Sequence, residues 1–218
     1  MPPSPLRIAH RGMPRLAREN TLPSFQLALD AGADGLELDV HTTADGVVVV
    51  HHDPDLAAGP RIDALTLGEL RRHEAAPRVP IPTLEELCTL VQGRATLFVE
   101  LKGAAVERAV LDVLAGYDGP VALHSFDHAM IRRTARLSSE RRLGILYDDA
   151  PVGVAREMAE TGALDVWPHW KLVTEELVAE VHEAGGRVIP WTVNDPSTAQ
   201  ALASLGVDGL CGDDVRIL

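Results

Sequence analysis

The feature that most constrains this chain is a regular alternation of short apolar runs with amphipathic stretches. Runs with β-strand character recur at eight places, namely residues 6–9, 35–40, 96–101, 120–126, 142–148, 164–170, 187–193 and 207–212. Stretches with helical periodicity lie between most of these runs, as in residues 21–32, 83–93 and 174–186. Parallel strands need crossover helices of this kind. We therefore predict an α/β fold in which eight parallel strands close into a (β/α)8 TIM barrel.

Threonine and glycine residues mark the ends of the predicted helices. Threonine stands at the N-cap position of three helices, at Thr21, Thr83 and Thr174. Glycine follows the last turn of the same helices, at Gly32, Gly93 and Gly185. An open doubly wound sheet is the main alternative, but that fold needs a glycine-rich phosphate turn after its first strand, where this chain reads HRGMPR. A single barrel domain over residues 1–218 is the expected organisation.

One segment interrupts the alternation of strands and helices. Residues 47–53, VVVVHHD, follow the second strand after the short connection TTADG, which cannot hold a parallel crossover. Because Asp45-Gly46 is a turn signal, we predict a short β-hairpin inserted after the second strand. Its return strand would carry His51 and His52 back beside that strand. The alternative is an exposed hairpin in which the two histidines have no functional role.

Composition excludes several classes of function. The formal net charge of −12 opposes nucleic acid binding, and the chain has no stripe of Lys and Arg that would reverse this charge locally. The chain has neither an apolar run of about 18 residues nor a signal-peptide core near its start, so we expect no stable membrane insertion and a cytoplasmic location. The two cysteines, Cys88 and Cys211, lie far apart and are typical of small core residues in a reducing compartment.

Carboxylates gather at the carboxyl ends of the first predicted strands. Glu37 and Asp39 share one face of their strand, because alternate residues of a strand point the same way. Glu100 ends the third strand, and this end of a barrel is where active sites are built. Converging carboxylates repel one another, and a divalent cation relieves that repulsion. An all-oxygen ligand set favours Mg²⁺ or Ca²⁺, and rim carboxylates paired with Arg or Lys are the alternative.

Basic and imidazole groups accompany these carboxylates. His10 and Arg11 end the first strand, and Lys102 follows Glu100 on the same face. Arginine and lysine both match phosphate oxygens. His10 and His52 ordinarily titrate near neutral pH, which suits a general acid and a general base in one catalytic cycle. Together with a divalent cation, these groups indicate cleavage of a phosphodiester.

Six motifs follow one another from about residue 6 to residue 214. They are IAHRG, then EN-T-LPSFQLALDAGADGLELDVHTTADGVVVVHHDP, VELK, HSFD, WTVND and GVDGL. In this order they resemble the glycerophosphodiester phosphodiesterase family. The resemblance implies a TIM barrel with a short hairpin insertion. It also implies metal-dependent hydrolysis of glycerophosphodiesters to sn-glycerol 3-phosphate and an alcohol.

The resemblance also assigns roles to individual residues. It places the acid/base pair on His10 and His52, and the metal ligands on Glu37, Asp39 and Glu100. It places phosphate contacts on Arg11 and Lys102, and an aromatic wall beside the glycerol on Trp191. His52 is preferred to His51 because the family's histidine directly precedes an aspartate, here Asp53. Attack on phosphorus by the glycerol 2-hydroxyl, through a cyclic phosphate, and attack by water both remain open.

Other polar residues are expected to have supporting or structural roles. Glu19 would steady a cationic group and Asn20 the loop that enters the first helix, and helix capping is equally open. Three residues near later strand ends, His124, Phe126 and His169, are candidates for lining the leaving-group side of the site, and ordinary packing is the favoured interpretation for each. A solvated surface position is expected for His41, His73, His128 and His182.

The sequence departs from the family pattern in two places, and two other functions stay open. DPDLAAGPRIDALTLGEL replaces a longer loop, which predicts a more open cleft, and Gly212 stands where the family often has a bulkier hydroxyl residue. A lysophospholipid phosphodiesterase would show an apolar patch at the barrel mouth, and no clear patch is visible in the sequence. A non-catalytic phosphate-binding barrel is disfavoured because all five histidine and carboxylate side chains are present.

Overall fold

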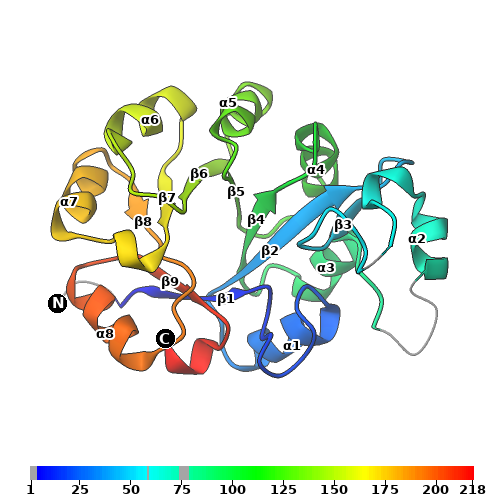
Figure 1. Ribbon diagram of the computed structural model, residues 1–218, viewed down its shortest axis with the longest axis horizontal. Helices are drawn as coiled ribbons and strands as arrows, with labels where there is room; N and C mark the ends of the chain where they lie inside the picture. The colour runs from blue at the N-terminus through cyan, green and yellow to red at the C-terminus, as the bar shows by residue number, and fades with distance from the viewer. Residues whose placement is uncertain (1–3, 58, 74–78) are drawn as a thin grey trace.

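Eight parallel strands form a ring that is surrounded by helices in the computed structural model (Figure 1), which describes residues 4–57, 59–73 and 79–218. The strands of the ring are β1 Leu6–His10, β2 Gly35–Thr42, β4 Thr96–Leu101, β5 Val121–Ser125, β6 Arg142–Tyr147, β7 Asp165–Pro168, β8 Arg187–Val188 and β9 Gly209–Gly212. Their order is β8-β7-β6-β5-β4-β2-β1-β9. The predicted TIM barrel is confirmed.

The helices alternate with these strands, as the sequence pattern indicates. They are α1 Leu22–Asp30, α2 Leu67–His73, α3 Leu84–Val91, α4 Glu107–Leu114, α5 His128–Leu137, α6 Val154–Thr161, α7 Glu175–Glu183 and α8 Pro196–Ser204. Three short 3-10 turns complete the described elements, η1 Ile62–Ala64, η2 Trp170–Leu172 and η3 Val215–Ile217. In the part of the chain that the structure describes, no helix has both the length and the apolar character needed to cross a membrane.

The predicted helix ends are confirmed. The side chains of the three threonines, Thr21, Thr83 and Thr174, accept hydrogen bonds from backbone N–H groups of the first turns of α1, α3 and α7. Each glycine expected after these helices has a positive φ, at Gly32, Gly93 and Gly185. Such left-handed backbone after a helix favours glycine, because its lack of a Cβ removes the steric penalty.

The predicted hairpin after β2 is also confirmed. Strand β3, Val48–Val50, pairs antiparallel with β2, and Val40 lies opposite Val50. The chain then continues into His51, whose N–H donates to the carbonyl of Asp39 at 3.0 Å. This bond holds the two histidines beside the carboxyl-terminal half of β2.

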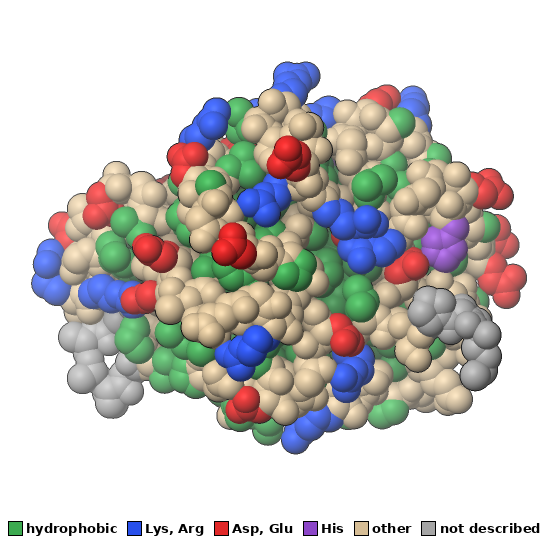
Figure 2. Space-filling model, turned by 180° about the vertical axis from the view of Figure 1, so that it is seen from behind, with side chains coloured by type: hydrophobic (Ala, Val, Ile, Leu, Met, Phe, Trp, Pro, Cys, Tyr) green, Lys and Arg blue, Asp and Glu red, His purple; other side chains and the backbone are tan. Residues whose placement is uncertain are grey.

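Apolar side chains from several strands pack together inside the ring. Ile8, Phe98 and Trp167 are fully or almost fully buried in this inner cluster, and Cys211 packs with them. The inner cluster is continuous with the floor of the candidate site, because Trp167 and Cys211 also line its cavity. Outside the ring, acidic and basic side chains lie interspersed on the face shown in Figure 2.

The barrel closes between β8 and β9 through irregular backbone. Strand β8 is shorter than the predicted run 187–193, because Pro190 has no N–H to donate to a ladder. Backbone N–H groups instead cross the seam from Cys211 to the carbonyl of Pro190 at 3.0 Å, and from Val193 to the carbonyl of Cys211 at 2.8 Å. Closure of the barrel therefore depends on close approach of the backbone at 190–193 to the backbone of β9.

Replacing Gly212 with alanine should destabilise this seam. A Cβ at Gly212 would clash with the backbone carbonyl of Val193, which cannot move without breaking the seam. We expect a loss of about 3 kcal/mol in the free energy of unfolding, within the usual range for overpacking. Urea denaturation measures it, and Gly68→Ala in α2 is the matched control, because its added Cβ would meet only the end of Arg72. An equal loss in both variants would contradict this account.

Candidate active site

The register of the sheet brings the predicted site residues side by side. His10 lies opposite Glu37 in the β1–β2 pair, and Asp39 lies opposite Glu100 in the β2–β4 pair. Glu100 in turn lies opposite His124 in the β4–β5 pair. Paired residues on neighbouring strands are about 5 Å apart. Four adjacent strands therefore deliver ionisable side chains to the carboxyl-terminal end of the barrel.

A cavity of about 140 Å³ lies among these side chains. Seven of the eight predicted site residues line the cavity, namely His10, Arg11, Glu37, His52, Glu100, Lys102 and Trp191. Among the described residues, the lining includes His52 but not His51. The eighth predicted residue, Asp39, is fully buried beside the cavity and contacts its cationic side chains.

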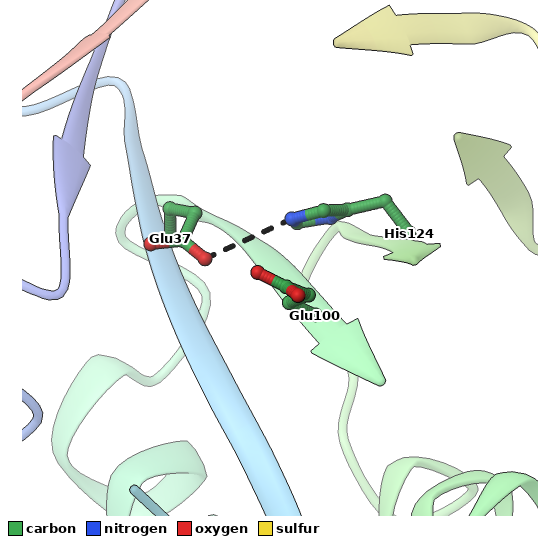
Figure 3. Close-up of side chains that lie close together, drawn as sticks. All are labelled: Glu37, Glu100 and His124. Carbon is green, nitrogen blue, oxygen red and sulfur yellow. Dashed lines mark ion pairs between the residues drawn. The ribbon is translucent and has the colours of Figure 1, made fainter. Parts of the chain in front are cut away.

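Glu37, Glu100 and His124 form a group that could hold a metal ion (Figure 3). One ligand atom from each residue lies within 4.8 Å of the other two, and all three residues are buried. The distance from Nε2 of His124 to Glu37 is 3.7 Å, and neither ring nitrogen of His124 has a hydrogen-bond partner. Unpaired nitrogens in a buried site are costly unless something binds them. The donor atoms therefore fit a divalent cation.

Asp39 is engaged by cationic and amide groups. Its Oδ2 accepts a hydrogen bond from Asn20 at 2.8 Å and lies 3.2 Å from Nε of Arg11. Its Oδ1 lies 3.4 Å from Nζ of Lys102. Burial would raise the pKa of Asp39, but the charges of Arg11 and Lys102 outweigh burial and lower it. The ligand role of Asp39 stays a prediction, while the other two predicted ligands belong to the buried group of Figure 3.

Glu100 and Lys102 are in direct contact at the cavity wall. Their side chains lie 2.7 Å apart. Burial and the nearby charge of Asp39 raise the pKa of Glu100 to about 8. Burial lowers the pKa of Lys102, but the charges of Glu100 and Asp39 outweigh burial and raise it. Burial and the neighbouring carboxylate of Asp39 thus disfavour the ionised form of Glu100, which is the condition that a bound cation would relieve.

Arg11 lines the cavity and is held by Glu19, the residue that the sequence suggested. Its Nη1 lies 3.2 Å from Glu19, while its Nε lies 3.2 Å from Asp39. Burial lowers the pKa of Arg11, but Asp39 and Glu37 outweigh burial and raise it, so the guanidinium stays charged. The next residue, Gly12, has a φ of 86° and packs closely against Ser24, which explains glycine in the IAHRG motif.

Each of the two predicted catalytic histidines is held at Nδ1 by a carboxylate. His10 lies 2.7 Å from Asp213, and His52 lies 2.7 Å from Asp53. Burial lowers the pKa of His10, but the hydrogen bond to Asp213 and the charge of Glu37 outweigh burial and raise it. In both histidines Nε2 is the ring nitrogen left for the cavity.

A second, wider cavity opens beside the first. Its volume is about 660 Å³, and it shares His52, Glu100, Lys102 and Phe126 with the central cavity. The rest of its lining includes the apolar side chains of Pro54, Leu101, Ala104, Ala105 and Met130. A substrate that reaches the carboxylates could therefore extend a further group into this space.

Aromatic rings form one wall of the site. Trp191 donates its Nε1–H to the carbonyl of Trp167 at 2.9 Å, which fixes the indole. The rings of Phe126 and His169 pack edge-on against Trp191 at centroid distances of 5.5 Å and 5.6 Å. Trp191 thus lines the cavity, and Phe126 contributes to the lining in addition to packing.

Two interpretations of histidines from the sequence were wrong, while the packing expected for His124 is confirmed by its stacking on Trp167 at a centroid distance of 4.4 Å. His124 also lies in the buried group with Glu37 and Glu100. His41 was expected at the surface, but it is buried, and its Nε2 lies 3.1 Å from the carbonyl oxygen of His52. His128 is also withdrawn from solvent, with a side chain 19% exposed that pairs with Glu157 at 3.1 Å.

Comparison with known proteins agrees with this geometry. Residues 10–217 match the model of the glycerophosphoryl diester phosphodiesterase family. A glycerophosphodiester phosphodiesterase of Bacillus altitudinis is 31% identical over 228 residues, which cover 94% of this chain and 93% of that protein. A glycerophosphodiester phosphodiesterase of Caldanaerobacter subterraneus is 29% identical over 232 residues, with 98% of this chain and 96% of that protein covered. A similar solved structure is that of an Oleispira antarctica phosphodiesterase in complex with the product sn-glycerol-3-phosphate. Its TM-score to this chain is 0.90 at 27% sequence identity, and the match covers 98% of this chain and 95% of that chain.

Proposed function

The chain belongs to the glycerophosphoryl diester phosphodiesterase family and is therefore a phosphoric diester hydrolase, and we propose a specific catalytic arrangement for it. Its substrates are glycerophosphodiesters, which it hydrolyses to sn-glycerol 3-phosphate and an alcohol. His10 and His52 act as general acid and general base. One observation carries this proposal: two imidazoles held at Nδ1 by carboxylates line the same cavity as buried Glu37 and Glu100.

A divalent cation belongs to the proposed site. Glu37 and Glu100 would hold it, together with Asp39 once this carboxylate exchanges its contacts with Arg11 or Lys102. When bound, the cation neutralises charge on the phosphate and so assists attack at phosphorus. We propose Mg²⁺ or Ca²⁺, because carboxylate oxygens dominate the donor set.

The protein's own groups supply charge neutralisation and proton transfer. Arg11 and Lys102 line the cavity, where their charges can meet phosphate oxygens. One imidazole takes a proton from the attacking hydroxyl group, and the other gives a proton to the oxygen of the leaving alcohol. The attacking group is water, or it is the glycerol 2-hydroxyl, in which case loss of the alcohol leaves a cyclic phosphate that water then opens to sn-glycerol 3-phosphate with the roles of the two imidazoles exchanged. A substrate without the 2-hydroxyl that reacts equally fast would exclude the cyclic route.

Lysophospholipid hydrolysis is a second candidate function, and specific surface residues favour it. Leu16, Phe126 and Val152 follow β1, β5 and β6, at the same end of the barrel as the site. Their exposed fractions are 52%, 40% and 93%. Exposed apolar groups around a site can contact an acyl chain or a lipid surface. The sequence alone gave no sign of such groups, since loop exposure depends on the fold.

The proposed function also implies a binding partner and a cellular location. The partner we propose is a small glycerophosphodiester, without nucleic acid and without stable membrane insertion. The cytoplasm is the proposed location, because Cys88 and Cys211 are free thiols, as is usual in a reducing compartment. Burial raises the pKa of Cys88 to about 11, so this thiol stays protonated near neutral pH.

A substrate panel tests the proposed function. Purified protein with a divalent cation is offered glycerophosphocholine, glycerophosphoethanolamine, glycerophosphoglycerol and lysophosphatidylcholine, and released sn-glycerol 3-phosphate is measured by a coupled dehydrogenase assay. We expect turnover of the glycerophosphodiesters. Choline release from lysophosphatidylcholine alone, without any glycerol 3-phosphate from the other substrates, would replace the first candidate with the second.

A further inference from the structure

We propose that Asp213 and Asn194 are positioning residues that hold His10 in one orientation and one tautomer, with its Nε2 left for the substrate. The inference rests on the proposed function of His10. Asp213 lies directly after β9, the strand that pairs with β1, so barrel closure brings it to His10. Its Oδ1 lies 2.7 Å from Nδ1 of His10.

The carboxylate of Asp213 is itself fixed by Asn194, across the seam of the barrel. Nδ2 of Asn194 donates to Oδ2 of Asp213 at 2.6 Å, and the backbone N–H of Asp213 donates to Oδ1 of Asn194 at 3.0 Å. Arg15, from the loop after β1, donates to the carbonyl of Asn194 at 3.0 Å. Three loops therefore converge behind His10, and both carboxylate oxygens of Asp213 have partners.

These contacts determine the proton position on His10. An ionised carboxylate only accepts hydrogen bonds, so Nδ1 of His10 must donate and Nε2 of the neutral ring carries the lone pair. Burial would raise the pKa of Asp213, but the hydrogen bonds from His10 and Asn194 outweigh burial and lower it, so the carboxylate stays ionised. The lone pair at Nε2 is what a base needs, and the same atom can later hold the proton.

The partner of His52 is held less firmly. Asp53 is the next residue in the chain, and its side chain is 70% exposed, whereas that of Asp213 is 24% exposed. Water can replace an exposed partner, but it cannot easily replace one fixed inside a seam. Loss of the carboxylate should therefore lower kcat more at Asp213 than at Asp53.

The key variant is Asp213→Asn, because Asn194 dictates how the new amide must turn. Nδ2 of Asn194 still needs an acceptor, so the amide oxygen faces Asn194 and the amide NH₂ faces His10. Nδ1 of His10 must then accept, which moves the proton to Nε2 and removes the lone pair from the cavity. We expect kcat for glycerophosphocholine to fall about 100-fold with KM changed less than threefold, as for other histidine-orienting groups.

A compensating variant separates positioning from a merely structural role. In Asp213→Asn combined with Asn194→Asp, the new carboxylate accepts from the amide NH₂, so the amide oxygen can turn back to Nδ1 of His10. We expect kcat to recover at least tenfold over the single variant. Asp214→Asn is the matched control and should keep the wild-type kcat, because Asp214 binds Arg216 rather than His10.

Nitrogen-15 NMR of labelled histidine reads the tautomer directly, without reference to activity. At a pH high enough to keep the ring neutral, the His10 signal, assigned by its loss in His10→Gln, should show a proton on Nδ1 in the wild type and on Nε2 in Asp213→Asn. An unchanged tautomer, or a kcat within threefold of wild type, would overturn the positioning role. If wild type releases no glycerol 3-phosphate from any substrate, the proposed function fails, while the tautomer measurement still decides the inference.

Discussion

Replacing His10 with alanine should lower kcat for glycerophosphodiesters by about three orders of magnitude, within the usual range for a general acid or base. His10 lines the central cavity and lies opposite Glu37 on the neighbouring strand. Among the described residues that line this cavity, the other two imidazoles are already engaged, because His52 is the second member of the proposed acid/base pair and His124 lies in the buried group with Glu37 and Glu100. Steady-state kinetics with the coupled dehydrogenase assay measures this loss.

His52→Ala should show a loss of similar size, because general acid and base act in the same cycle. Removing both imidazoles should cost little more than removing one, since residues that act as a unit are not additive. His73→Ala is the matched control, because His73 is exposed at the end of α2. A variant without His10 that retained a tenth of wild-type kcat would exclude His10 from catalysis.

The fold could be predicted because its signals are local. Strand and helix periods, threonine caps and the Asp45-Gly46 turn each depend on a few neighbouring residues, and the structure confirms them. The carboxylates could be placed for the same reason, since Glu37 and Asp39 share a strand face whatever else the chain does. The length of β8 was overestimated most, because Pro190 interrupts the ladder, and β7 and β9 are also shorter than the predicted runs.

The position of His124 beside Glu100 could not be predicted, because it depends on the register between strands. His124 lies opposite Glu100 only because β4 and β5 pair in one specific alignment. The signal was present, since His124 is an ionisable residue near the carboxyl end of a strand, as Glu100 is. Apolar neighbours in the strand made packing the natural interpretation.

Asp213 was missed for a related reason. It lies 203 residues from His10 in the chain, and their contact exists only because β9 pairs with β1. No local pattern encodes that pairing. The general expectation that polar residues after barrel strands reach the site would have singled out Asp213.

Replacing Glu100 with glutamine should weaken binding of a divalent cation by about 100-fold or more, because even outer-sphere partners contribute 10- to 100-fold. Glutamine keeps the size of the side chain but loses the charge and one strong donor oxygen. Isothermal titration calorimetry with Mg²⁺, Ca²⁺ and Mn²⁺ measures the affinity. Chelation with EDTA should abolish activity in the wild type, and added cation should restore it.

The control for this substitution is another buried glutamate outside the site. Glu107 is buried at the start of α4 and pairs with Arg133 at 2.7 Å, and neither residue lines the central cavity. Glu107→Gln should therefore leave cation affinity unchanged. Equal affinities in the wild type and Glu100→Gln would remove Glu100 from the ligand set.

The raised pKa of Glu100 adds a dependence on pH that the glutamine variant must lose. Without a cation, burial and Asp39 raise the pKa of Glu100 from 4.5 to about 8, so the side chain holds its proton near pH 7. Binding a cation must displace this proton, so affinity should rise about tenfold per pH unit and level off near pH 8. The cation-free protein should lose stability as the pH rises from about 4.5 to about 8. The reason is that the unfolded chain releases this proton at a lower pH than the folded protein does. Calorimetry in two buffers counts the protons released, and we expect about one fewer in Glu100→Gln than in the wild type.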